Sequence, residues 1–259
     1  MNPAGIHQRQ RQPSAAMPKT PTLPRMALLL AALTAIGPFA IDTYLPAFHD
    51  IETTLPATPR DMQLTLAIYM ATFAFMSLWH GALSDCFGRR AVIVTGGALF
   101  LVASLICALA PSSGWLLFGR GLQGMAAGAG IIVGRAMIRD LYSGALAQKL
   151  MSRVATIFAI APAAAPILGG WILYHGGWRA VFWFLVLFSA ALTWMAWKEV
   201  PETLPPEARK PLKPGSLLRA YVGIFRNREF LLLSAVLALC FNGFFVHIAA
   251  ASRFVKDFL

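Results

Sequence analysis

Seven long apolar stretches constrain the fold of this chain more than any other feature of its sequence. Each approaches or exceeds the roughly 20 residues that an α-helix needs to cross the hydrocarbon core of a bilayer. The composition agrees, because 58% of the residues are hydrophobic and only 13% are charged, unlike a soluble domain. We therefore predict an all-α integral membrane protein with spans at about residues 26–46, 62–82, 91–110, 115–137, 154–175, 178–197 and 230–251.

Basic residues are distributed unevenly between the connections of these spans. Lys and Arg total 17 on the side of the N-terminal tail and four on the opposite side, while Arg120 falls within a span. Because basic residues accumulate in cytoplasmic loops, we expect a cytoplasmic N-terminus. The net charge of +11 is then a topology signal, so we expect a lipid bilayer and no nucleic acid as the partner.

The connections divide the chain into four predicted parts. Residues 1–25 are polar and rich in proline, which predicts a disordered cytoplasmic tail. Residues 26–197 hold six spans and form the first domain, and the proline-rich segment 198–229 is predicted to be a cytoplasmic linker. Residues 230–259 are expected to provide the first helix of an incomplete C-terminal domain.

The connection between the second and third spans has the most specific sequence. It reads Gly81-Ala82-Leu83-Ser84-Asp85-Cys86-Phe87-Gly88-Arg89-Arg90, a turn with two glycines, a carboxylate and paired arginines. Its end is echoed before the sixth span by Gly177-Trp178-Arg179-Ala180-Val181, on the other side of the membrane. A 3+3 inverted repeat predicts such an echo, and a chance match of five residues is the alternative.

This turn resembles the signature cytoplasmic loop of the major facilitator superfamily. Four further segments extend the resemblance to its drug:proton antiporters of the bicyclomycin/chloramphenicol-resistance (Bcr/CflA) type, over residues 26–259. They are Ile41-Asp42-Thr43-Tyr44-Leu45-Pro46-Ala47, Gly119-Arg120-Gly121-Leu122-Gln123-Gly124, the proline-rich segment Ala161–Gly170, and Gly177-Trp178-Arg179 with Pro201-Glu202-Thr203-Leu204. The resemblance implies the six-helix N-domain of this fold, with a 3+3 inverted repeat, plus a seventh helix.

The resemblance also implies a function, which is proton-coupled efflux of small lipophilic drugs. The protein would be a multi-pass protein of the bacterial cell inner membrane, with drug and protons as partners and no cofactor. Two charged residues are the candidates for proton coupling, Asp42 in the first span and Arg120 in the fourth. A carboxylate at membrane depth usually faces a cavity, pairs or takes up a proton, although a hydrated Asp42 near the helix end is the alternative. For Arg120 the alternatives are a structural ion pair and a snorkelling side chain.

Three more groups of residues receive roles from the resemblance. The first is a gating loop that latches the two halves of the carrier, where a simple tight turn is the alternative. The second is the antiporter motif of the fifth span, where ordinary small-residue packing is the alternative. The third lines the substrate cavity, where packed or lipid-facing side chains are the alternative. The gating loop comprises Gly81, Asp85, Gly88, Arg89, Arg90 and Asp140. The antiporter motif comprises Pro162, Pro166, Gly169 and Gly170, and the cavity residues are Tyr69, Gln123 and Met125.

Other functions fit the sequence less well. A seven-helix receptor or light-driven pump would place the N-terminus outside, and a retinal protein would need a lysine in residues 230–251, which have none. Neither HExxH nor GxSxG occurs, so we expect no enzyme, and the three scattered cysteines predict no metal site. The family fold has twelve helices, so a truncated, non-transporting half-transporter that lacks its C-terminal half is the alternative function.

The predicted orientation can be tested with a reporter that is active only in the periplasm. Fused after Leu259, the reporter should be active, because seven spans from a cytoplasmic N-terminus end outside. Fused after Pro214, in the predicted linker, the reporter should be silent. The opposite pattern would overturn the orientation.

Overall fold

The computed structural model describes residues 23–240, 242 and 243, and all regular structure in this part of the chain is helical. Helix formation follows from the need to pair every backbone N–H and C=O inside a bilayer. The elements are α1 (Leu23–Asp42), η1 (Leu45–Ala47), α2 (Phe48–Thr54), α3 (Pro59–Phe87), α4 (Arg89–Ala108), α5 (Ser113–Leu141), α6 (Gly144–Glu199), η2 (Pro206–Ala208) and α7 (Pro214–Phe225).

Five helical segments of the described chain are long and apolar enough to cross a membrane. The 56-residue α6 contains two spans, because its backbone leaves the helical conformation at Gly177, where φ is 69°. Such a positive φ favours glycine, which has no Cβ to clash. The first six predicted spans are therefore present as helices. The seventh, at 230–251, lies partly outside the described residues, although residues 230–240 are helical.

The two segments of the sequence echo have a backbone feature in common. Gly88, which precedes α4, has a φ of 99°, and Gly177 precedes the second half of α6 with its φ of 69°. Each glycine thus ends one helix and starts the next in a conformation that L-residues rarely adopt. This similarity is what a repeat predicts, and the inverted repeat itself stays a prediction.

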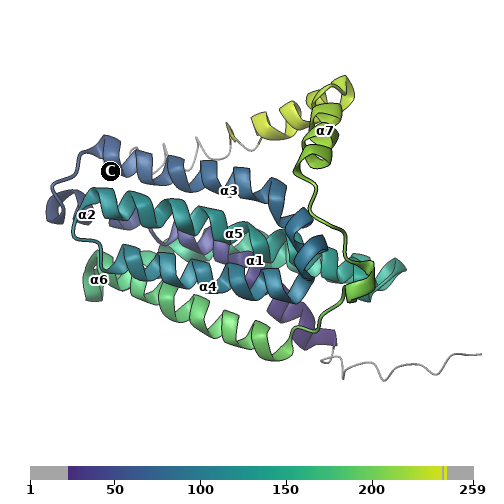
Figure 1. The fold of residues 1–259 in the computed structure, drawn as a ribbon. Coiled ribbons are helices and arrows are strands. Elements are labelled where there is room, and N and C mark those ends of the chain that lie inside the picture. The colour runs from purple at the N-terminus through teal and green to yellow at the C-terminus, as the bar shows by residue number, and fades with distance from the viewer. Residues whose placement is uncertain (1–22, 241, 244–259) are drawn as a thin grey trace, which may run out of the picture. The chain divides into compact units, whose positions relative to one another are not determined.

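Helix α5 lies at the centre of the first compact unit, Met1–Lys210. It packs against α3 and α4, while α6 packs against α1 and α4 (Figure 1). Glycines on α5 allow this close approach. A Cβ on Gly124 would collide with the backbone carbonyl of Tyr69 in α3, and one on Gly130 would lie 2.5 Å from the carbonyl oxygen of Leu33 in α1. Small residues at such contacts are characteristic of membrane helix bundles.

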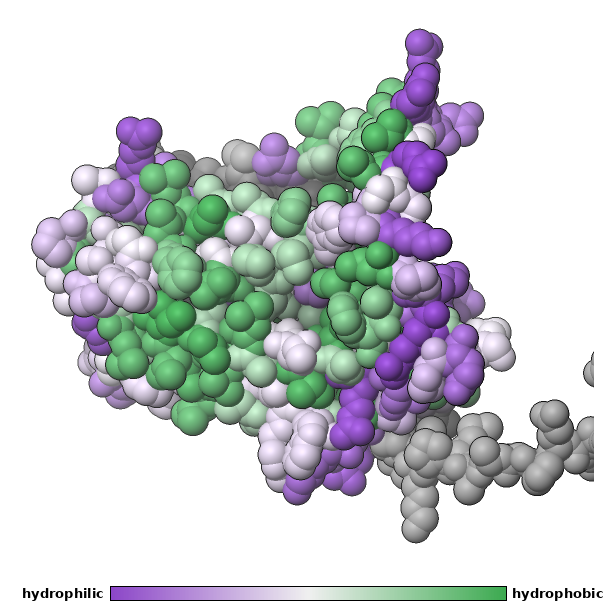
Figure 2. Space-filling model, in the orientation of Figure 1, coloured by the Kyte–Doolittle hydropathy of each residue, from purple (hydrophilic) through white to green (hydrophobic). Residues whose placement is uncertain are grey.

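The outer surface of this bundle is apolar along its sides. Figure 2 shows hydrophobic residues across the flank of the helices and hydrophilic residues gathered towards the helix ends. Large apolar side chains such as Phe75, Ile167 and Leu187 are more than half exposed. Their exposure suits a lipid environment, where apolar side chains need no protein cover.

The second compact unit is Pro211–Leu259, which contains α7. The division between the units falls within the predicted linker, 198–229, so residues up to Lys210 belong to the first unit. The other predicted boundaries stay predictions.

Candidate functional site

Arg120 of α5 is completely buried within the helix bundle. Its Nη1 donates hydrogen bonds to the carbonyl oxygen of Ala40, at 2.9 Å, and to Oε1 of Gln123, at 2.8 Å. The carbonyl of Ala40 is available because α1 ends at Asp42, which leaves the last carbonyls of the helix without intrahelical partners. The end of α1 therefore provides part of the binding site for the guanidinium.

Two tyrosine rings face the same guanidinium. The Cζ atom of Arg120 lies 4.7 Å from the ring centre of Tyr44 and 4.3 Å from that of Tyr69. Cation–π contacts of this kind contribute about 0.5–2 kcal/mol each. The tyrosines are held in turn by polar contacts, since the Tyr44 hydroxyl is 2.8 Å from that of Thr65 and the Tyr69 hydroxyl donates to the carbonyl of Gly37 at 3.3 Å.

Helix α4 contributes to the site through Ser104, which binds Gln123. Nε2 of Gln123 donates to Oγ of Ser104 at 2.8 Å, and Ser104 is itself completely buried. This contact orients the amide so that its oxygen points to Arg120. Residues of α1, α3, α4 and α5, with Tyr44 from the turn after α1, thus surround one positive charge.

The charge of Arg120 is nevertheless only partly satisfied. Its Nε and Nη2 atoms are buried and have no hydrogen-bond partner, and no carboxylate of the described chain forms an ion pair with it. An uncompensated buried charge costs several kcal/mol, so the groups around Arg120 must stabilise it. Two donors remain in the protein interior for an acceptor or an anion.

Asp42 is the last residue of α1 and is only 8% exposed. Its carboxylate makes no hydrogen bond or ion pair with a described residue, so it forms no direct pair with Arg120. The carbonyl that binds Arg120 belongs to Ala40, two residues before Asp42 in α1.

The predicted cavity residues separate in the structure. Tyr69 and Gln123 both contact Arg120, and both are buried. Met125 is partly buried on α5 and takes no part in the contacts around Arg120.

The predicted antiporter motif lies within α6. Pro162 and Pro166 do not interrupt this helix, whose backbone is non-helical only at Gly177. Gly169 packs closely against the turn after α1, since a Cβ there would lie 2.7 Å from the Cα of Thr43. Gly170 faces open space.

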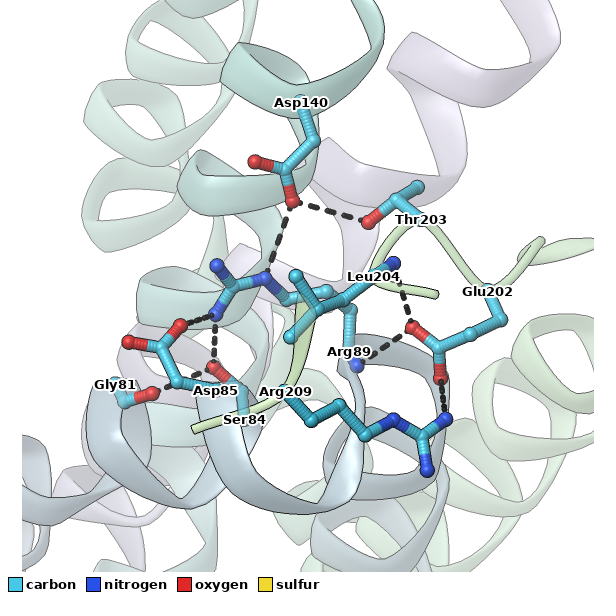
Figure 3. Close-up of polar contacts among 9 residues, drawn as sticks. All are labelled: Gly81, Ser84, Asp85, Arg89, Asp140, Glu202, Thr203, Leu204 and Arg209. Carbon is cyan, nitrogen blue, oxygen red and sulfur yellow. Dashed lines mark hydrogen bonds and ion pairs between the residues drawn. The ribbon is translucent and has the colours of Figure 1, made fainter. Parts of the chain in front are cut away.

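A second charged cluster joins α3, α4 and α5 at the predicted gating loop (Figure 3). Nη1 of Arg89 contacts Oδ1 of Asp85 at 2.6 Å and Oγ of Ser84 at 2.5 Å, and its Nε donates to Oδ2 of Asp140 at 3.1 Å. The Ser84 hydroxyl donates to the carbonyl of Gly81 at 2.8 Å. One largely buried arginine thus binds carboxylates from two other helices.

Arg90 uses a different partner. Its Nη2 donates to the backbone carbonyl of Trp197, near the end of α6. The paired arginines therefore connect the loop to three helices besides their own.

Glu202, which follows α6, caps the N-terminus of α4. Its Oε1 accepts hydrogen bonds from the backbone N–H of Arg89, at 2.9 Å, and of Leu204, at 3.1 Å, while Oε2 is 3.7 Å from Nη2 of Arg209 (Figure 3). The N-cap residue of α4, Gly88, has no side chain to satisfy these N–H groups, so a carboxylate 113 residues away in sequence does so. A Cβ on Gly88 would collide with this carboxylate.

Two more contacts attach the same segment to the cluster. The hydroxyl of Thr203 donates to Oδ2 of Asp140 at 3.0 Å, and the backbone N–H of Lys210 donates to the carbonyl of Asp85 at 3.0 Å. Residues 201–210, the docking segment, are therefore bound to the predicted gating loop. Sequence reasoning missed this role, although the carboxylate of Glu202 directly after a span, on a side rich in basic residues, was a signal for it.

No group of three or more metal-binding side chains occurs in the described part of the chain.

These features define a multi-pass α-helical membrane protein with a buried cation between its spans. The chain belongs to the Major Facilitator Superfamily, whose family model matches residues 28–258. This membership confirms the family predicted from the sequence.

Named relatives agree with the branch that the sequence resembles. The chain is 31% identical to the "Bicyclomycin resistance protein homolog" of Haemophilus influenzae, with 87% of this chain and 56% of the relative covered. It is also 31% identical to "Multidrug resistance protein D" of Escherichia coli (79% and 51%) and 32% identical to the "Uncharacterized MFS-type transporter YdgK" of Bacillus subtilis (90% and 58%). The chain thus spans between half and three fifths of the length of these relatives.

A solved structure supports the fold. The crystal structure of the human organic anion transporter MFSD10 (TETRAN) matches with a TM-score of 0.60 and 22% identity, over 74% of this chain and 51% of that one.

The capping role of Glu202 predicts a local change in the variant Glu202→Ala. Removal of the carboxylate leaves the N–H of Arg89 without its partner, which should destabilise the docking segment by about 1–2 kcal/mol. Trypsin should then cleave after Arg209 about tenfold faster than in the wild type. Glu207→Ala is the matched control, because Glu207 is an exposed acid of the same segment. Equal cleavage rates for both variants would contradict the capping role.

Proposed function

We propose that this chain forms the N-terminal half of a proton-coupled exporter of small lipophilic drugs in the bacterial inner membrane, with its N-terminus in the cytoplasm. The observation that carries the proposal is the buried, incompletely paired Arg120, which binds the carbonyl of Ala40 two residues before the unpaired Asp42. Ionisable groups inside a membrane domain are rare and usually mark substrate or proton pathways. The names of the relatives, which include bicyclomycin and multidrug resistance proteins, favour drugs as the substrate class.

The chemistry of the proposed coupling depends on how close Asp42 is to Arg120. An arrangement in which the carboxylate reaches the free N–H groups of Arg120 favours its ionised form, because opposite charges stabilise one another. An arrangement in which they are apart favours proton uptake. A drug that binds the two arrangements unequally therefore exchanges for a proton, since a ligand shifts an equilibrium by its difference in affinity.

Tyr69 and Gln123 are the proposed link between substrate and charge. Both contact Arg120, so displacement of either side chain alters the surroundings of its charge. Gly169 allows α6 to pack directly against the backbone of Thr43, next to Asp42. A shift of α6 would therefore be transmitted to the end of α1.

The gating loop has a separate proposed role. Asp85 is partly exposed although it binds Arg89, so its carboxylate remains available to a further partner. We expect this partner in the other half of the carrier, where the loop would latch the two halves together. The cluster of Arg89 and Asp140 would then hold the latch in its working position.

The variant Asp42→Asn tests the coupling role in a carrier that has both halves of the cavity. The amide keeps the size of the side chain but cannot exchange a proton, so a lipophilic antibiotic should still bind. Proton release on drug addition, followed with a pH-sensitive dye in detergent, should disappear together with uphill transport.

Asp50→Asn is the matched control, because Asp50 lies eight residues further along, in α2. It should release protons as the wild type does. Wild-type proton release from Asp42→Asn would show that another acid carries the proton.

A further inference from the structure

Helix α7 has an apolar face and a basic edge. At about 100° per residue, Leu217, Leu218, Tyr221, Val222, Ile224 and Phe225 fall within an arc of about 160°. Four of these side chains, Leu218, Val222, Ile224 and Phe225, are 41–66% exposed. Arg219 and Arg226, seven residues apart, both lie along one edge of this arc.

The charged residues in and around α7 are all positive. Between Glu207 and Glu229 the segment that contains α7 holds six basic residues and no acid. The basic residues are Arg209, Lys210, Lys213, Arg219, Arg226 and Arg228. The long side chains of Arg219 and Arg226 can place their charges beyond the apolar face, as arginine does at membrane interfaces.

The position of α7 in the chain brings it to a membrane surface. The helix follows α6, whose second half is a span, by 14 residues, and it has only 12 residues, too few to cross a bilayer. A bend separates α7 from the next helix, because the side chain of Asn227 accepts hydrogen bonds from the backbone N–H of Glu229 at 3.0 Å and of Phe230 at 3.3 Å. Asn227 thereby caps a new helix whose described residues are mostly apolar and exposed.

We propose that α7 lies in the plane of the membrane interface and that Arg219 and Arg226 bind the phosphate groups of anionic phospholipids. The apolar arc would enter the boundary between headgroups and acyl chains, as in other interfacial amphipathic helices. Because these charges are all positive and two of them lie along the edge of the apolar arc, they favour an anionic lipid surface. This proposal does not depend on the proposed transport activity.

The test places a fluorescent label on either face of α7 in the full chain. The three native cysteines, Cys86, Cys107 and Cys240, are replaced by alanine, and a single site is introduced as Leu218→Cys or Ala220→Cys. Each protein is reconstituted in nanodiscs of phosphatidylcholine with or without phosphatidylglycerol. Quenching by doxyl groups on the lipid chains and by aqueous iodide reports where each label lies.

We expect lipid quenching for the label at position 218, stronger with phosphatidylglycerol, and iodide quenching for the label at position 220. Each basic residue at an anionic surface strengthens binding about fivefold, so Arg219→Gln with Arg226→Gln should lower the ratio of bound to free α7 about 30-fold and remove the effect of phosphatidylglycerol. The matched control, Lys149→Gln with Arg153→Gln, changes two exposed basic residues of α6 and should leave that effect intact.

Three results would overturn the proposal. Equal iodide quenching at both positions would show that α7 lies in water. Lipid quenching at position 218 that does not respond to phosphatidylglycerol, or to the two arginine substitutions, would show that anionic lipid is not the partner. Protection from both quenchers would show that a protein surface covers the apolar face.

Discussion

The positive charge of Arg120 must be stabilised where no bulk water is available, and the surrounding helices are arranged accordingly. Helix α1 ends early enough to leave the carbonyl of Ala40 free, and the chain then turns so that the ring of Tyr44 faces the guanidinium. Helix α3 approaches α5 closely at Gly124, next to Tyr69. Because each contact uses a different element, the packing of α1, α3 and α5 depends on this buried charge.

The two polar sites are connected by the same helices. Tyr69 and Asp85 both belong to α3 and are about 24 Å apart along its axis, while Arg120 and Asp140 of α5 are about 30 Å apart. A helix that tilts as a rigid body moves both of its ends. On the proposed mechanism, a tilt of α3 or α5 would carry a change at Arg120 to the predicted gating loop, to which the docking segment adds a contact from the end of α6.

The sequence predicted the spans and the loop well because both depend on local composition. Apolar length sets where a helix crosses the bilayer, and the signature turn needs glycine at position 88 for its backbone conformation. The sequence could not predict that Asp42 and Arg120 form no ion pair, because the guanidinium is held by groups from several helices that no local pattern connects. It also assigned Glu202 to a linker, since a cap supplied from 113 residues away leaves no local pattern.

Infrared difference spectroscopy of a carrier with both halves, recorded as drug is added, tests the central claim most directly, since it observes protonation of the carboxyl itself. If Asp42 gives up its proton when drug binds, the carbonyl band of a protonated carboxyl should decrease and a carboxylate band should increase. Both changes should be absent from Asp42→Asn. The same difference bands in that variant would contradict the account, because the exchanged proton would then belong to another group.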